Sequence, residues 1–220
     1  MNIKAFGLVA IVVLFIYLQV KKESDLDTLE STLKSYKESM LDGNYDKAAE
    51  LIYPKVFDTV SKEQLLEKIQ KRKSSHSIIT QLELTPRLPI ITYSEGVYTL
   101  VDYEVQKEID LSLALKKDGS SLDEKELKRL KKMTLAFFRI EMKKGDYLHS
   151  DEGSFLINIK KSGTYIYINE HHTGWKYIDT SFLRKKRLKE ILHKDIINQE
   201  QEFIVNIEDS YMMELFGAKY

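Results

Sequence analysis

The segment from Val97 to Leu115 alternates between two kinds of side chain over an unusual length. Its odd positions are apolar or favour strands, with Lys107 as the exception, and its even positions from Asp102 to Ser112 are mostly acidic or polar. A period of two predicts a β-strand with one buried and one solvated face. Such a strand is longer than usual, so we expect a bend or bulge, and Lys107 marks its position. A lysine that faces a pocket is the alternative interpretation of Lys107.

Helical patterns occupy the chain before this strand. Apolar residues recur at steps of three and four in residues 26–52, which predicts two helices separated at Gly43 and stopped by Pro54. Ser61 and Gln64 form a capping-box signature that predicts the start of a third helix.

A charged insert follows the long strand at residues 116–132. Its composition predicts a short solvated helix, capped by Ser121 and Glu124.

Strand patterns surround the long strand and the insert. Apolar residues alternate in residues 78–85, 138–142 and 155–159, and residues 161–163 (Lys-Ser-Gly) predict a turn. The order is therefore helices followed by an antiparallel meander, which predicts an α+β fold.

Residues 3–20 form an apolar run of about 18 residues, near the lower limit for a helix that spans a bilayer. We interpret residues 1–23 as an uncleaved membrane anchor. A cleaved signal peptide is the main alternative, although the run lacks the small residues of a cleavage site; a soluble helix is the third. Positive charge is similar on both sides, so the orientation follows only from analogy with ordinary signal anchors. That analogy predicts a single-pass membrane protein whose large domain lies outside the cytoplasm, in the periplasm if the source is bacterial.

Composition excludes several classes of function. Lys and Arg total 34 and Asp and Glu total 34, so no overall charge attracts nucleic acid, and there are no cysteines for disulfides, thiol catalysis or thiolate-bound zinc. Nucleotide-binding glycine motifs, nucleophile elbows and metal-ligand spacings are also absent from the sequence. We therefore expect no catalytic residue, no metal and no cofactor.

His171 and His172 lie in a polar, glycine-terminated segment between two aromatic strands. Adjacent residues of a hairpin loop diverge and do not easily share one metal. We interpret both histidines as loop residues.

The order of elements resembles the nuclear transport factor 2-like superfamily, in which a curved sheet forms a cone around helices. The resemblance covers about residues 26–181. It depends on "YKESMLDGNYDKAAELIYP", which is similar to the helix pair of that family, and on "HTGWKYIDTS", which is similar to its closing strand. We divide the chain into residues 1–23, a cone-like domain over residues 24–181, and a C-terminal helix and tail over residues 182–220.

The resemblance fixes no single function, because members include isomerases, dehydratases, ligand-binding proteins and structural modules. We expect a non-enzymatic binding or scaffold module that binds a protein partner or a small apolar ligand; homo-oligomerisation stays open. An inner-membrane assembly subunit of a secretion-type machine and a small-molecule isomerase or dehydratase are the alternatives. The candidate cone-lining residues are Tyr36, Tyr103, Lys107, Phe138 and Trp175.

The tail carries a basic run at residues 184–187 beside the apolar residues Leu188, Ile191, Leu192 and Ile196. The spacing of the apolar residues predicts a helix docked on the domain. A bilayer-facing patch or a partner contact is the alternative for the basic run.

Overall fold

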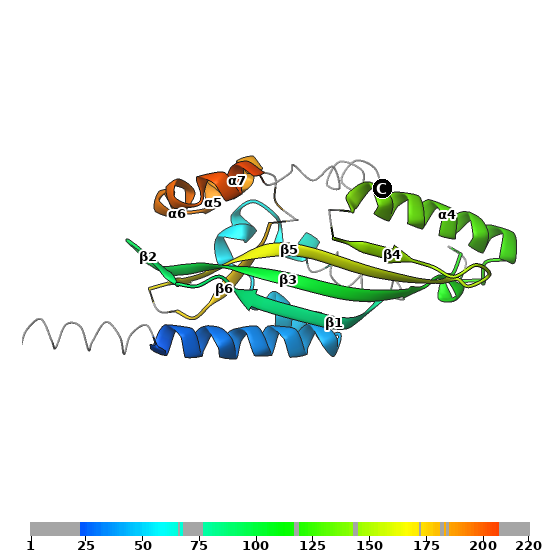
Figure 1. Ribbon diagram of the computed structural model, residues 1–220, viewed down its shortest axis with the longest axis horizontal. Helices are drawn as coiled ribbons and strands as arrows, with labels where there is room; N and C mark the ends of the chain where they lie inside the picture. The colour runs from blue at the N-terminus through cyan, green and yellow to red at the C-terminus, as the bar shows by residue number, and fades with distance from the viewer. Residues whose placement is uncertain are drawn as a thin grey trace, which may run out of the picture.

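The computed structural model describes residues 23–65, 67, 77–116, 119–142, 145–171, 173–180, 183 and 185–206. Over these residues the protein has an α+β fold, in which helices pack on a curved antiparallel sheet of six strands (Figure 1). This arrangement is consistent with the expected cone. The apolar run at residues 3–20 lies outside the described residues; within them, no helix is both long and apolar enough to cross a membrane.

Two long strands form the centre of the sheet. β3 (Gly96–Asp110) and β5 (Leu156–Glu170) pair in one unbroken antiparallel register, from Gly96 opposite Glu170 to Asp110 opposite Leu156. The short strands flank this ribbon: β1 (Ser77–Pro86) and β2 (Ile91–Tyr93) pair with β3, and β4 (Tyr147–His149) and β6 (Lys176–Asp179) pair with β5.

The long strand is shorter than predicted. β3 ends at Asp110, whose carboxylate accepts a hydrogen bond of 2.9 Å from the Ser112 amide and so starts the 3-10 helix η2 (Leu111–Leu113). The predicted irregularity lies on the neighbouring strand: the register of β1 shifts between Ile79 and Gln81, opposite Lys107. Lys107 therefore lies beside the bulge and not within it.

Both faces of the ribbon are covered near the Gly96 end. The helix that includes residues 23–41 packs on the face that carries the odd positions of β3. The C-terminal helices α5 (Lys185–Ile191), α6 (Lys194–Gln199) and α7 (Gln201–Asn206) cover the even positions. Tyr98 and Leu100 are consequently 0% and 5% exposed. The prediction of one solvated face is thus wrong for this end, because the tail supplies a second layer.

The C-terminal helices belong to the main core. Leu188, Ile191, Leu192 and Ile196 are all buried in the same apolar cluster as the sheet, as the helical spacing predicted. The chain on either side of residue 182 therefore shares one core.

Helix α4 (Glu124–Glu141) replaces both the short helix and the strand that were expected here. Its capping box is formed by Asp123 and Glu126, with both hydrogen bonds at 2.8 Å, and not by Ser121 and Glu124. The alternation that predicted a strand at residues 138–142 is short. Helical spacing extends further, because Leu130 and Phe138 both pack on the apolar cluster around Ile157.

The predicted turn at residues 161–163 is also wrong, since β5 runs through it. Gly163 lies directly opposite Tyr103 on β3. A Cβ atom at Gly163 would approach Cζ of the Tyr103 ring to 2.5 Å. The glycine therefore admits an aromatic ring over the strand and does not mark a reversal of the chain.

The second helix is shorter than predicted, since α2 comprises Tyr45–Ala49, and Pro54, which was expected only to stop a helix, begins the 3-10 helix η1 (Pro54–Asp58). A helical turn at residues 62–65 follows. Ser61 Oγ accepts a hydrogen bond of 3.4 Å from the Gln64 amide, which is one half of the predicted capping box.

Candidate functional site

The interior of the cone is filled with tyrosine side chains. The face covered by the helix of residues 23–41 carries Tyr103, Tyr165, Tyr167 and Tyr177, and Tyr36 inserts from that helix. The Tyr103 and Tyr165 rings stack with centroids 4.3 Å apart, and the Tyr36 and Tyr177 rings meet edge to face at 4.8 Å. These contacts fill the space between the sheet and the N-terminal helix with aromatic rings.

Trp175 lies beside this tyrosine cluster and is 2% exposed. Its Nε1 donates to the carbonyl oxygen of Asp25 at 3.2 Å and lies 3.1 Å from Oγ1 of Thr28. The indole is therefore buried against the N-terminal helix. Its role is to tie the closing strand to that helix.

The other two candidate residues lie elsewhere. Phe138 is on α4, in the second apolar cluster, where the ammonium group of Lys161 lies 5.3 Å from its ring centroid. Lys107 is near the far end of β3, paired with Ile159 of β5. The structure therefore brings Tyr36, Tyr103 and Trp175 to the region under the N-terminal helix and separates Lys107 and Phe138 from them.

The buried phenols are poor proton-transfer groups. Burial raises the pKa of Tyr36, Tyr165 and Tyr167 well above the ordinary value, and neighbouring phenols or Asp179 raise it further. Tyr36 donates a hydrogen bond of 3.3 Å to the Tyr165 hydroxyl. Within the described part of the chain, the Tyr167 hydroxyl is buried without a hydrogen-bond partner. All of these phenols remain protonated near neutral pH.

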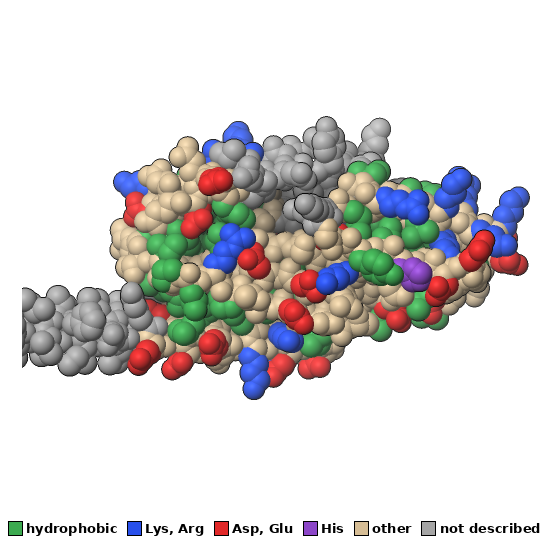
Figure 2. Space-filling view, in the orientation of Figure 1, with side chains coloured by type: hydrophobic (Ala, Val, Ile, Leu, Met, Phe, Trp, Pro, Cys, Tyr) green, Lys and Arg blue, Asp and Glu red, His purple; other side chains and the backbone are tan. Residues whose placement is uncertain are grey.

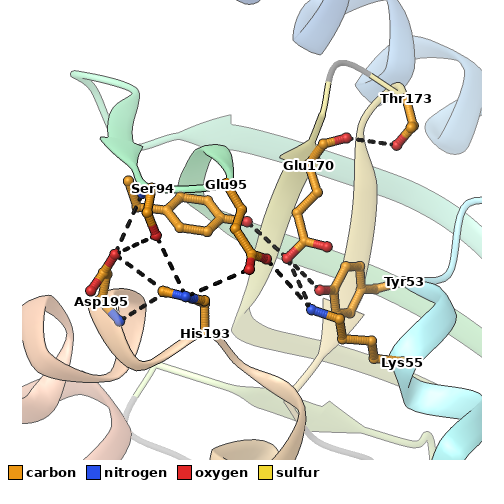
Figure 3. A network of polar contacts seen from close by, with 9 residues as sticks. Tyr53, Lys55, Ser94, Glu95, Glu170, Thr173, His193 and Asp195 are labelled. Atoms are coloured by element: carbon orange, nitrogen blue, oxygen red, sulfur yellow. Dashed lines mark hydrogen bonds and ion pairs between the residues drawn. The ribbon is translucent and has the colours of Figure 1, made fainter.

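A second polar cluster lies at the Gly96 end of the ribbon, where β2, β5, η1 and α6 meet (Figure 3). Its centre is Glu170, the last residue of β5. One oxygen, Oε1, accepts hydrogen bonds from Tyr53 at 2.6 Å, Tyr93 at 2.9 Å and Lys55 at 3.3 Å. Lys55 also approaches Glu95 at 3.8 Å. Glu170 thereby links three segments that are distant in sequence.

The electrostatics of this cluster stabilise the carboxylate. Burial alone would raise the pKa of Glu170, but hydrogen bonds from Tyr53, Tyr93 and Lys55 lower it below its usual range. Burial and the hydrogen bonds to Glu170 raise the pKa of Tyr53 and Tyr93 strongly. Glu170 is therefore a weak base and both tyrosines are weak acids, so the cluster suits a structural clamp better than proton transfer.

Ser94, His193 and Asp195 lie next to this clamp and contain the residue types of a hydrolase triad. Their hydrogen bonds do not follow the order found in such a triad. Nδ1 of His193 accepts from the Asp195 amide at 3.2 Å, which caps α6, and Ser94 Oγ donates to Oδ2 of Asp195 at 2.7 Å. Nε2 of His193 lies 3.5 Å from Ser94 Oγ, whereas the Ser94 hydroxyl donates directly to the Asp195 carboxylate. The three residues are therefore not arranged as a Ser-His-Asp relay, in which the serine would donate to the histidine.

Sequence reasoning missed this network because its members come from four separate segments without regular spacing. The one available signal is a carboxylate at the end of an aromatic strand, Glu170. His171 is in the turn that follows, with a positive φ of 50°, and its amide donates to the Glu95 carbonyl at 2.9 Å. His172 lies outside the described residues. Among the described residues, no group of three potential metal ligands comes together.

No family model matches the chain, and no curated protein matches it. Among solved structures, the chain is similar to a presumed dehydratase of the nuclear transport factor 2-like family from Streptomyces avermitilis. The identity is 10% and the TM-score is 0.36, with 71% of this chain and 93% of that chain covered. Such a distant similarity indicates neither a ligand nor a reaction for this chain.

Proposed function

We propose that the chain is a membrane-tethered, non-enzymatic binding or scaffold module, with residues 3–20 as the tether and the cone-like domain outside the cytoplasm. The observation that carries the non-enzymatic part is the filling of the cone by its own tyrosines. A protein partner fits this arrangement better than a small apolar ligand, because stacked rings occupy the space that a ligand would need.

The isomerase or dehydratase alternative requires a base and an acid that face a bound substrate. The tyrosines inside the cone have raised pKa values, and the carboxylate of Glu170 has a lowered one. These directions remove the groups best placed for proton transfer from the useful range near pH 7. An assembly subunit of a secretion-type machine remains a proposal within the scaffold class.

Tyr167→Phe tests whether side chains alone fill the cone. If no ligand or ordered solvent occupies the cone, removing the unpaired hydroxyl should leave the melting temperature unchanged or raise it, because a buried unpaired polar group is unfavourable. Tyr36→Phe is the matched control, because it removes the 3.3 Å hydrogen bond to Tyr165 and should lower the melting temperature. A clear loss of stability in Tyr167→Phe would show that its hydroxyl has a bound partner and would favour a ligand-binding or catalytic cone.

The tether and its orientation need a separate test. The chain has no cysteine, so Ile78→Cys, at a side chain that is 58% exposed, introduces one labelling site on β1. If the domain is extracytoplasmic, a membrane-impermeant maleimide should label the introduced thiol in intact cells, and the protein should stay in the membrane fraction after carbonate extraction. Labelling only after lysis would place the domain in the cytoplasm, and extraction by carbonate would remove the tether from the proposal.

A further inference from the structure

Helix α4 has an apolar surface that the sheet does not cover. Its inward side packs Leu130 and Phe138 on the second apolar cluster. On another side, Met133 and Ile140 are 60% and 83% exposed, and Ala136 is exposed between them. The spacings of three and four residues place these side chains in one row, which we call the α4 stripe (Met133, Ala136 and Ile140). Figure 2 shows hydrophobic and basic side chains next to each other over α4.

The charge around the stripe indicates which kind of segment can bind to it. α4 has six basic and three acidic side chains, a net charge of +3. Lys128 pairs with Glu124 at 2.6 Å, and Lys131 donates to backbone carbonyl groups of the turn before β5. Arg129, Lys132 and Arg139 are exposed and form no ion pair with any described residue. Arg129 continues the row of the stripe four residues before Met133, and Lys132 and Arg139 lie beside the row, each one residue before a member of it. Two copies of this helix would repel each other, whereas a segment with apolar and acidic residues would complement it.

Residues 207–220 have this composition. They follow α7 directly and contain Glu208, Asp209 and Glu214 against a single Lys219. The large apolar residues that accompany these acidic groups are Ile207, Tyr211, Met212, Met213, Leu215, Phe216 and Tyr220. The segment lies outside the described residues, so only its sequence and its attachment to α7 enter the argument.

The attachment point lies within reach of the stripe. Glu200, just before α7, accepts a hydrogen bond of 3.0 Å from Tyr98, so α7 begins near Tyr98 of β3. Phe138 of α4 lies under Lys161, which pairs with Val105, so α4 lies near Val105 of the same strand. From Tyr98 to Val105 the strand advances about 23 Å at ~3.3 Å per residue. The twist of the ribbon brings α7 and α4 to the same side of the molecule (Figure 1). Residues 207–220 reach up to about 46 Å when extended, which is ample.

We propose that residues 207–220 dock on the α4 stripe of their own chain, with the acidic residues beside Arg129, Lys132 and Arg139. Covalent attachment to α7 gives the segment an effective concentration at the stripe on the order of millimolar, which an external peptide would have to exceed. This inference does not depend on the proposed tether or on the filled cone.

Disulfide trapping in the full chain tests the proposal, because the chain has no cysteine of its own. The trial variant is Ile140→Cys with Phe216→Cys. The matched control is Ile78→Cys with Phe216→Cys, since Ile78 is also exposed, at 58%, and pairs with Glu108 at the same end of the ribbon but on the opposite face. We expect the trial pair to form an intramolecular disulfide at least about tenfold faster than the control pair under mild oxidation.

Charge reversal provides the second arm. Lys132→Glu with Arg139→Glu should slow trapping of the trial pair, and adding Glu208→Lys with Asp209→Lys should restore it. Equal rates for the two cysteine pairs would overturn the proposal. A disulfide between two chains would instead assign the stripe to a second copy, and trapping that is suppressed by anionic phosphatidylglycerol vesicles but not by phosphatidylcholine vesicles would assign it to a lipid surface. Either of these results also overturns the intramolecular docking.

Discussion

Gly163→Ala should destabilise the protein through one contact, with the ring of Tyr103. The new Cβ atom would approach Cζ and Oη of that ring to 2.5 Å, so the ring must move. Tyr103 is stacked on Tyr165 with an interplanar angle of 20°, and moving the ring breaks this stack. Over-packing costs about 1–3 kcal/mol, and an aromatic pair contributes about 0.5–1.5 kcal/mol of such a total. We expect a loss of about 1–3 kcal/mol in the free energy of unfolding.

Gly163→Ala should have the opposite effect on the free energy of unfolding when the Tyr103 ring is absent. The backbone at Gly163 does not have a left-handed φ, so alanine fits it without strain. In a Tyr103→Ala background, Gly163→Ala should therefore stabilise the fold by about 0.4–1 kcal/mol through the unfolded chain. The coupling between the two sites is the quantity that isolates the ring contact.

Urea unfolding followed by the fluorescence of Trp175, the single tryptophan, measures all four variants without a label. Thermal unfolding provides a second readout, at about 2–4 °C per kcal/mol for a chain of this size. If Gly163→Ala is destabilising by the same amount with and without the Tyr103 ring, the close approach is not its cause. The explanation that Gly163 is needed to leave room for the Tyr103 ring would then be wrong.

Trp175→Ala should cost about 3–5 kcal/mol, because the indole is 2% exposed, while Lys176→Ala on the opposite face should cost little; chemical denaturation checks both. Gly96→Ala should cost more than Gly163→Ala, because its Cβ atom would overlap the backbone carbonyl oxygen of Asn169, which cannot rotate away; melting temperatures compare the two. Glu170 has a pKa lowered in the folded state, so its contribution to stability should be present above its unfolded pKa of about 4.3 and disappear as the pH falls through the folded value. Glu170→Gln should remove that part of the acid dependence in denaturation curves measured from pH 7 to pH 3, and an unchanged acid dependence would rule out the clamp as its source.

The parts of the fold that were predictable are those where one periodicity extends over many residues. The N-terminal helix buries Leu29, Leu33 and Tyr36, as steps of three and four require. Trp175 and Tyr177 share a buried side because a strand has a period of two. In these segments local pattern and tertiary packing favour the same structure.

The failures occur where the pattern is short or depends on a distant partner. Phe138, Ile140 and Met142 fit an alternating strand, but the helix is decided by its capping box and by contacts with residues that follow later in the chain. The alternating pattern therefore predicts a cone-lining Phe138, whereas the side chain packs in the second apolar cluster. Tyr98 is buried by helices near the C-terminus, and no periodicity within its own strand reveals that cover. The Glu170 network depends in the same way on tertiary contacts.

The unbroken pairing of β3 with β5 also has a consequence for the order in which this ribbon assembles. Of all the pairs in this ribbon, Asp110 and Leu156 are the closest in sequence, and the segment between them contains α4. Closing the shortest loop first costs the least chain entropy. Within this ribbon, we therefore expect the ends of the two strands next to α4 to pair first. Pairing then proceeds towards Gly96 and Glu170, and the Glu170 contacts are among the last to form and the first to be lost on unfolding.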